Sequence, residues 1–192
     1  KYEEHPALPT QELSHRTKNL LTVVQAMVRQ IGRRARSFAE FEERLQGCIM
    51  ALSHCHDLLV ASDWQGPDLR SLVRVQSATY GGLDAQHFQI EGPPVKLAPQ
   101  AAQLVGLALH ELATNAAKHG ALRSTQGIID ISWHLDGDKA VRLIWQERNG
   151  PPVMRPSSTG FDHVVLQHMA ASLDSEVSLQ FPSDGALWRM RI

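Results

Sequence analysis

The chain has 192 residues, of which 43% are apolar and 20% are charged. This composition excludes the disordered class, and the length predicts one α/β domain together with a smaller helical module. The formal net charge of −1 provides no overall basic field, so we expect no nucleic-acid partner.

The two cysteines, Cys48 and Cys55, would lie about 10 Å apart on one helix, too far for a disulfide with each other. This favours a reducing, cytoplasmic location. The sequence has no apolar run of membrane-spanning length and no apolar leader, so we expect no membrane contact from it. Because the first residue is Lys1 rather than Met, we expect a fragment of a longer protein.

Apolar residues recur at three- and four-residue steps over residues 9–34 and again over 37–60. This spacing predicts two amphipathic helices, with a turn at Gly32 and with Ser37 as the N-cap of the second helix. The apolar seam of such a helical hairpin is best buried against a second copy of the chain. We therefore expect residues 1–62 to form a dimerisation module in a homodimer.

Turn-forming residues from Ser62 to Pro67 mark a boundary, so residues 63–192 are expected to form a second domain. Three helices are predicted in it, over about 67–78, 99–119 and 160–173. Alternating strands are predicted near 88–91, 129–135, 141–147, 177–181 and 188–192. Asp136-Gly137 supplies a hairpin turn, and Gly120 is expected as the C′ residue of the long helix. The pattern predicts an α+β fold, a helical hairpin followed by a two-layer α/β sandwich.

The long helix carries the first candidate site. Glu111, Asn115 and Lys118 lie at positions i, i+4 and i+7, on one helix face. A carboxylate and an amide oxygen one turn apart suit Mg²⁺, and a lysine one turn further suits the phosphates that the cation bridges. The pattern favours a site for ATP and Mg²⁺. The alternative is a solvated helix surface with an ordinary Glu–Lys pair.

A second candidate lies at the end of the 141–147 strand. Trp145 and Glu147 share the parity of the apolar side chains, so Glu147 is expected to face the core. A buried carboxylate needs donors, and the amino group of adenine is one. The turn at Asn149-Gly150 would let a ligand approach the backbone closely, while Trp145 is expected to shape the pocket rather than to do chemistry.

Two weaker candidates complete the set. Gly160 and Phe161 lie in a loop before an expected helix, where backbone N–H groups could meet phosphate. His15 lies on a polar stripe of the first helix, where a neutral ring nitrogen could act as a nucleophile. Neither position is specific alone, since most surface histidines and most glycines before helices bind nothing.

Together these motifs resemble the HWE family of sensor histidine kinases, over nearly the whole chain. The phosphoacceptor pattern H-R-x-K-N is present as His15 to Asn19, and the block H-E-L-x-T-N-A-x-K as His110 to Lys118. The W-x-E motif is present as Trp145 to Glu147, and a W-x-G segment as Trp64 to Gly66. The resemblance implies a GHKL-type ATP-binding domain after the helical hairpin, and a response-regulator receiver domain as partner.

The roles implied by the resemblance are His15 as nucleophile, Asn115 as Mg²⁺ ligand and Glu147 as adenine contact. Glu111 and Lys118 are further catalytic candidates. The candidate nucleotide-binding set is His110, Asn115, Lys118, Trp145, Glu147, Gly150, Gly160 and Phe161.

Two positions depart from the family pattern. Asn149 stands before Gly150 where the family usually has a glycine pair, and Asp162 follows Phe161 where a glycine is usual. An acidic residue beside a phosphate loop is unfavourable, so a catalytically weak or silent phosphotransfer scaffold is an alternative. Two further alternatives are an ATPase of the same fold that is not a kinase and a metal site at residues 54–57.

Overall fold

The structure is a computed structural model that describes residues 10–33, 35–80, 86–137, 140–152, 176–183 and 185–192. Contacts divide the chain into two compact units, Lys1–Gln46 and Gly47–Ile192, with the division inside a continuous helix. Within the described ranges, the helices are too short or too polar to cross a membrane.

The first unit contains α1, Thr10–Gly32, and the beginning of α2, Phe38–Ala61. Both helices were expected from the apolar spacing. Ser37 Oγ accepts a hydrogen bond from the backbone N–H of Glu40 at 3.1 Å, and the Glu40 carboxylate accepts one from the N–H of Arg36 at 2.9 Å. This reciprocal capping satisfies two donors at the helix start and confirms Ser37 as the N-cap.

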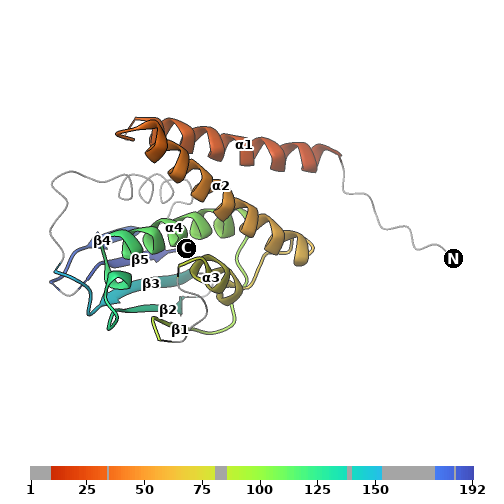
Figure 1. Ribbon diagram of the computed structural model, residues 1–192. Helices are drawn as coiled ribbons and strands as arrows, with labels where there is room; N and C mark the ends of the chain where they lie inside the picture. The colour runs from red at the N-terminus through yellow and green to blue at the C-terminus, as the bar shows by residue number, and fades with distance from the viewer. Residues whose placement is uncertain (1–9, 34, 81–85, 138–139, 153–175, 184) are drawn as a thin grey trace. The chain divides into compact units, whose positions relative to one another are not determined.

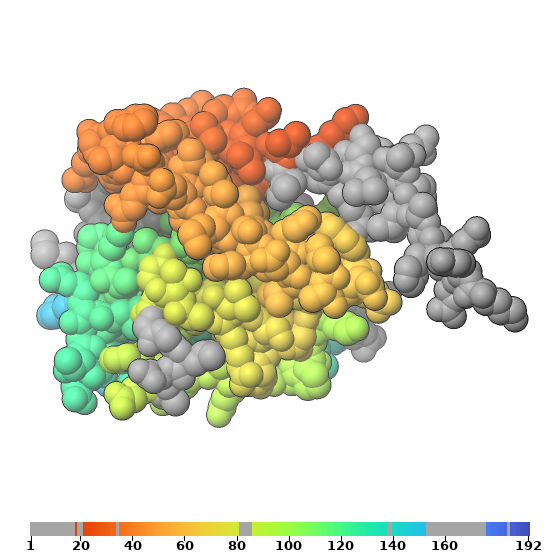
Figure 2. Space-filling model, turned by 45° about the vertical axis from the view of Figure 1, so that its right-hand side comes forward, coloured from red at the N-terminus to blue at the C-terminus, as the bar shows by residue number. Residues whose placement is uncertain are grey.

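The second part of α2 packs with α3, Leu69–Ala78, and α4, Pro99–Lys118. Gln76 of α3 donates from Nε2 to the backbone oxygen of Ala51 at 3.0 Å, and α2 lies beside α3 in the space-filling view (Figure 2). The buried residues of α2 all lie in this part: Cys48, Ala51, Leu52, Cys55 and Leu59. The contact boundary therefore precedes the 62–67 loop, while the functional division into 1–62 and 63–192 stays a prediction.

A five-stranded sheet with the order β1-β2-β3-β5-β4 forms the base of the second unit (Figure 1). The strands are β1 Phe88–Glu91, β2 Ile128–Asp136, β3 Ala140–Arg148, β4 Val177–Gln180 and β5 Leu187–Arg191. β1 pairs in parallel with β2, and the other pairs are antiparallel. With the helices, this mixed sheet confirms the α+β class and the two layers that the sequence predicts.

One face of the sheet forms the core. Its central side chains are almost fully buried, and they are Ile129, Ile131, Trp133, Leu143, Trp145, Glu147, Trp188 and Met190. The alternation predicted from the sequence is therefore observed, and it carries one carboxylate, that of Glu147, into the core.

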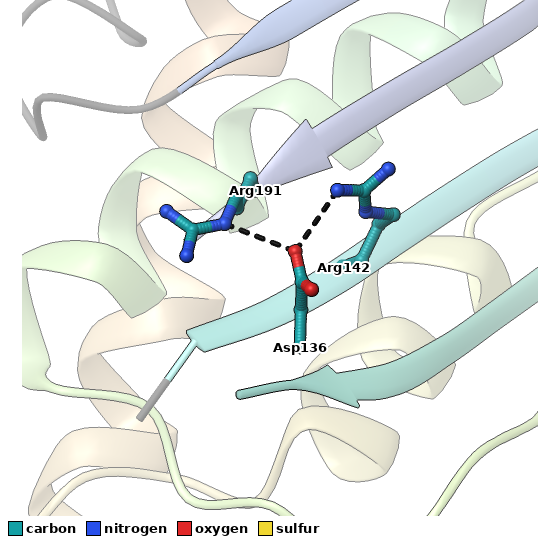
Figure 3. A network of polar contacts seen from close by, with 3 residues as sticks. All are labelled: Asp136, Arg142 and Arg191. Atoms are coloured by element: carbon teal, nitrogen blue, oxygen red, sulfur yellow. Dashed lines mark hydrogen bonds and ion pairs between the residues drawn. The ribbon is translucent and has the colours of Figure 1, made fainter. Parts of the chain in front are cut away.

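The opposite face carries charge. Asp136 Oδ2 accepts hydrogen bonds from Arg142 Nη2 at 2.9 Å and from Arg191 Nε at 3.0 Å, which joins β2, β3 and β5 (Figure 3). These hydrogen bonds lower the pKa of Asp136. Gly137 follows with φ of 77°, and Asp136 pairs with Ala140 in the antiparallel β2–β3 ladder, which confirms the predicted hairpin.

The W-x-G segment and the start of α3 lie against residues 95–97. Gly66 has φ of 102°, and a Cβ there would collide with the backbone oxygen of Leu97. The neighbouring Pro67 oxygen accepts the N–H of Leu97 at 3.0 Å, and Leu69 donates to Val95 at 2.8 Å. Glycine is required because the backbone needs both a positive φ and a close approach.

Candidate active site

The block on α4 runs from the core to the surface. Glu111 is buried, with 6% of its surface exposed, Asn115 is half-buried and Lys118 is exposed. Glu111 Oε1 lies 3.3 Å from Cys48 Sγ of α2, which is placed to donate. The alternative of a solvated helix surface is therefore wrong for Glu111, while Asn115 and Lys118 can meet a ligand at the surface.

Glu147 at the end of β3 is 3% exposed. Its Oε2 accepts the backbone N–H of Ala121 at 2.8 Å, and its Oε1 accepts Nε1–H of Trp145 at 3.4 Å. Burial raises the pKa of Glu147, and these two hydrogen bonds oppose the rise. The expected need for donors is confirmed, and both donors come from the protein. An adenine contact stays a prediction.

Gly120 and Gly150 leave space around the contact between Glu147 and the loop that follows α4. A Cβ on Gly120 would collide with Glu147 Oε2, and a Cβ on Gly150 would lie 3.0 Å from Ala121 Cα. Gly120 directly follows the C-cap His119, but with φ of −112° it is not left-handed. Glycine is needed there for space rather than for a helix-ending conformation, which corrects the reason given by the sequence.

Asn149 occupies the first position of the usual glycine pair with φ of 56°. This is the left-handed region, which asparagine adopts more readily than other residues with a Cβ. The turn that brings Gly150 to Ala121 is therefore kept despite the departure from the family pattern.

His110, at the start of the block, contacts α2 and the end of α3. Tyr80 Oη lies 3.3 Å from Nδ1 of His110 and 2.6 Å from Oγ1 of Thr114. The Thr114 hydroxyl donates to the backbone oxygen of His110 at 2.8 Å. Burial lowers the pKa of His110 to about 4. The ring is therefore neutral at physiological pH, and a direct contact between His110 and a nucleotide stays a prediction.

Comparison with known proteins identifies the family. Residues 12–94 match the family model described as HWE histidine kinase. A blue-light-activated histidine kinase of Brucella ovis is 30% identical over 191 residues, covering 97% of this chain and 39% of that protein. Blue-light-activated histidine kinase 1 of Erythrobacter litoralis is 36% identical over 180 residues, covering 91% of this chain and 49% of that protein. Over residues 12–94 the chain belongs to the HWE histidine kinases.

The solved blue-light activated histidine kinase of Erythrobacter litoralis superposes with a TM-score of 0.71 at 18% identity. The match covers 100% of this chain and 61% of that one, and at this identity it shows the fold alone. The chain therefore has the fold of that histidine kinase, and the GHKL-type assignment of its second unit stays a prediction. The chain spans less than half the length of the two curated relatives, 39% and 49%.

Three residues of the candidate nucleotide-binding set lie in the core of this chain. His110, Trp145 and Glu147 are 8%, 0% and 3% exposed. The Trp145 ring also packs edge-on against Phe88, with ring centres 6.4 Å apart. Trp145 therefore packs in the core, and its part in shaping a nucleotide pocket stays a prediction.

Several of the candidate positions predicted from the sequence lie outside the described residues. Gly160, Phe161 and Asp162 do so entirely, with the expected helix over 160–173. The backbone of His15 is in α1, but its side chain is not described.

The alternative metal site at residues 54–57 is not formed. Within the described ranges, no group of three His, Cys, Asp or Glu side chains is placed to hold a metal ion. His56 packs edge-on against Trp64, and Cys55 Sγ lies 3.7 Å from the backbone oxygen of Ala102. Burial raises the pKa of Cys55 to about 12, so its thiol stays protonated.

The sequence analysis assigned no role to five residues that contact the site residues. They are Thr114 of α4 itself and, from other segments, Gly47, Cys48, Tyr80 and Ala121. Thr114 alone had a local signal, because it lies inside the block. The others act through contacts between distant segments, and Ala121 does so through a backbone N–H that its side chain does not reveal.

Proposed function

We propose that the chain is the catalytic part of a sensor histidine kinase that transfers the γ-phosphoryl group of ATP to His15. A response-regulator receiver domain then accepts the group on an aspartate. The family assignment supports the reaction class, and the arrangement of α4 beside the end of β3 supports the site.

The hydrogen bond between Glu147 and Ala121 is the observation that carries the proposal. It is 2.8 Å long, and it joins the end of β3 to the loop that follows α4. The half-buried amide of Asn115 and the exposed ammonium of Lys118 lie in the last turns of that helix. A polar helix face thus lies next to a glycine-lined turn, which suits a ligand with an aromatic end and a charged end.

The oxygen donors of this face fit a hard cation. The Asn115 amide oxygen is proposed as a direct ligand of Mg²⁺, and the Glu111 carboxylate as its partner through water. A Mg²⁺ ion held there would supply positive charge to offset the charge of the ATP phosphates. Lys118 binds the same phosphates from the surface end of the helix.

The nucleotide base is assigned to the other end of the site. Glu147 and Gly150 are proposed to face the adenine, with Trp145 and His110 supporting the walls of its pocket. Gly160 and Phe161 are proposed to contribute backbone N–H groups to the phosphates.

In the phosphoryl transfer, a ring nitrogen of His15 bonds to the γ-phosphorus while the bond from that phosphorus to the β–γ bridging oxygen breaks. ADP leaves with the electron pair, and the N–H proton of the imidazole passes to solvent water. Arg16 follows His15 where a carboxylate would be needed to take that proton, so no base is assigned.

Homodimer formation through the α1–α2 hairpin is part of the proposal. Large apolar side chains are exposed on both helices, and they include Leu21 at 54%, Ile49 at 49% and Met50 at 55%. Burial in a second copy removes such surface from water. A monomer mass for the full chain in light scattering at micromolar concentration would contradict homodimer formation.

The two free thiols, Cys48 and Cys55, fit a cytoplasmic location.

The test is labelling with ATP that carries ³²P in its γ-phosphate. Wild type and a His134→Gln control, changed at an exposed histidine of β2, should label, and His15→Gln should not. Labelling of His15→Gln to the wild-type level contradicts the acceptor assignment. Release of free phosphate without labelled protein favours an ATPase, and a melting temperature that ATP and Mg²⁺ do not change favours a silent scaffold.

A further inference from the structure

Helix α2 contacts the first two residues of the α4 block through two of its own consecutive residues. Cys48 Sγ lies 3.3 Å from Glu111 Oε1. A Cβ added to Gly47 would lie 2.7 Å from His110 Nε2. The backbone of α2 therefore lies directly against the imidazole, and its thiol lies against the carboxylate.

This contact leaves little freedom to the Glu111 side chain. Cys48 is 2% exposed and Glu111 is 6% exposed, so little bulk solvent reaches the carboxylate. A buried carboxylate takes the position in which protein donors reach it. The position of α2 is in turn fixed by close packing, because a side chain at Gly47 would have to displace His110.

Resting on the proposed role of Glu111 beside the metal-bound water, we propose that Cys48 is a positioning residue that acts through Glu111. The α2 helix thereby holds the acidic group of the ATP site.

Cys55 provides a matched control on the same helix. It is 0% exposed, and its Sγ lies 3.7 Å from the backbone oxygen of Ala102, away from the block. Cys48→Ala and Cys55→Ala each delete one buried thiol, but only the first removes a donor from Glu111. Cys48→Ser keeps a donor at the position, since a hydroxyl is a stronger donor than a thiol.

The experiment measures the labelling rate at saturating ATP and the ATP concentration for half-maximal rate, in the full chain of each variant. Cys48→Ala should label about tenfold more slowly with a half-saturating concentration within about twofold of wild type, because misplacement affects the reacting geometry more than binding. Cys48→Ser should recover most of the rate. Cys55→Ala should label at the wild-type rate, even where its melting temperature falls as far as that of Cys48→Ala.

The two proposals fail in different ways. No labelling of wild type overturns the proposed kinase function itself. Normal labelling of wild type and of Cys48→Ala at equal rates overturns the positioning role alone. Equal slowing of Cys48→Ala and Cys55→Ala, without recovery in Cys48→Ser, also overturns it, because a general packing defect then accounts for the change.

Discussion

The carboxylate of Glu147 and the backbone N–H of Ala121 meet at 2.8 Å, 26 residues apart in the chain. Glu147→Ala should lower the free energy of unfolding by about 1–3 kcal/mol, because it leaves the buried N–H without its acceptor. Glu147→Gln should lower it less, since the amide oxygen can accept the same hydrogen bond. Urea unfolding measures both, and a Glu147→Ala midpoint equal to that of wild type would show that the contact is unimportant for stability.

Substitutions of Asn149 should change stability through the backbone conformation at this position rather than through lost side-chain contacts. The φ of Asn149 is 56°, so Asn149→Ala should lower the free energy of unfolding by about 1 kcal/mol, and Asn149→Gly should leave it equal or higher. Thermal unfolding of the three proteins checks the order. A more stable alanine variant than glycine variant would contradict the left-handed conformation.

The pKa of His110 predicts a loss of stability in acid. The folded protein binds the proton less well than the unfolded chain, because burial, His54 and Lys118 lower the pKa from 6.5 to about 4. The contribution of His110 to the free energy of unfolding is therefore complete above about pH 6.5. It is lost as the pH falls towards 4, by about 3 kcal/mol in total.

The comparison protein is His110→Gln, whose side chain does not titrate in this range. Chemical unfolding between pH 4 and 7 should show a steeper loss of stability in wild type than in the variant. Parallel curves would mean that His110 has an ordinary pKa in the folded protein.

Asn115→Ala should remove the magnesium dependence of nucleotide binding. In wild type, ATP with Mg²⁺ at 100 times its dissociation constant should stabilise the fold by about 2.7 kcal/mol, and ATP with a chelator should stabilise it less. The variant should show the same small shift under both conditions. A full magnesium-dependent shift in Asn115→Ala would exclude this amide as the metal ligand. The control is Gln103→Ala, because Gln103 is a half-buried amide on the same helix.

Strand parity made the direction of Glu147 predictable, because every second residue of β3 faces the core and the apolar residues mark that face. Ser37 was predictable as an N-cap for a similar reason, since capping depends on residues three positions apart. Both inferences use only local geometry.

The partners of the site residues were not predictable in this way. Cys48 and Glu111 are 63 positions apart, and no spacing rule connects a thiol on one helix with a carboxylate on another. Gly120 was placed correctly at the end of α4, but its close approach to Glu147 depends on how the sheet packs against the helix. Sequence patterns predicted the elements and their buried faces, whereas tertiary packing decided which side chains meet.

A crystal structure of the chain with Mg²⁺ and a non-hydrolysable ATP analogue tests the central claim most directly. The account predicts the metal ion bound to the amide oxygen of Asn115, the phosphates within reach of Lys118, and the adenine beside Glu147 and Gly150. An analogue bound elsewhere, or a metal ion coordinated without Asn115, would contradict it.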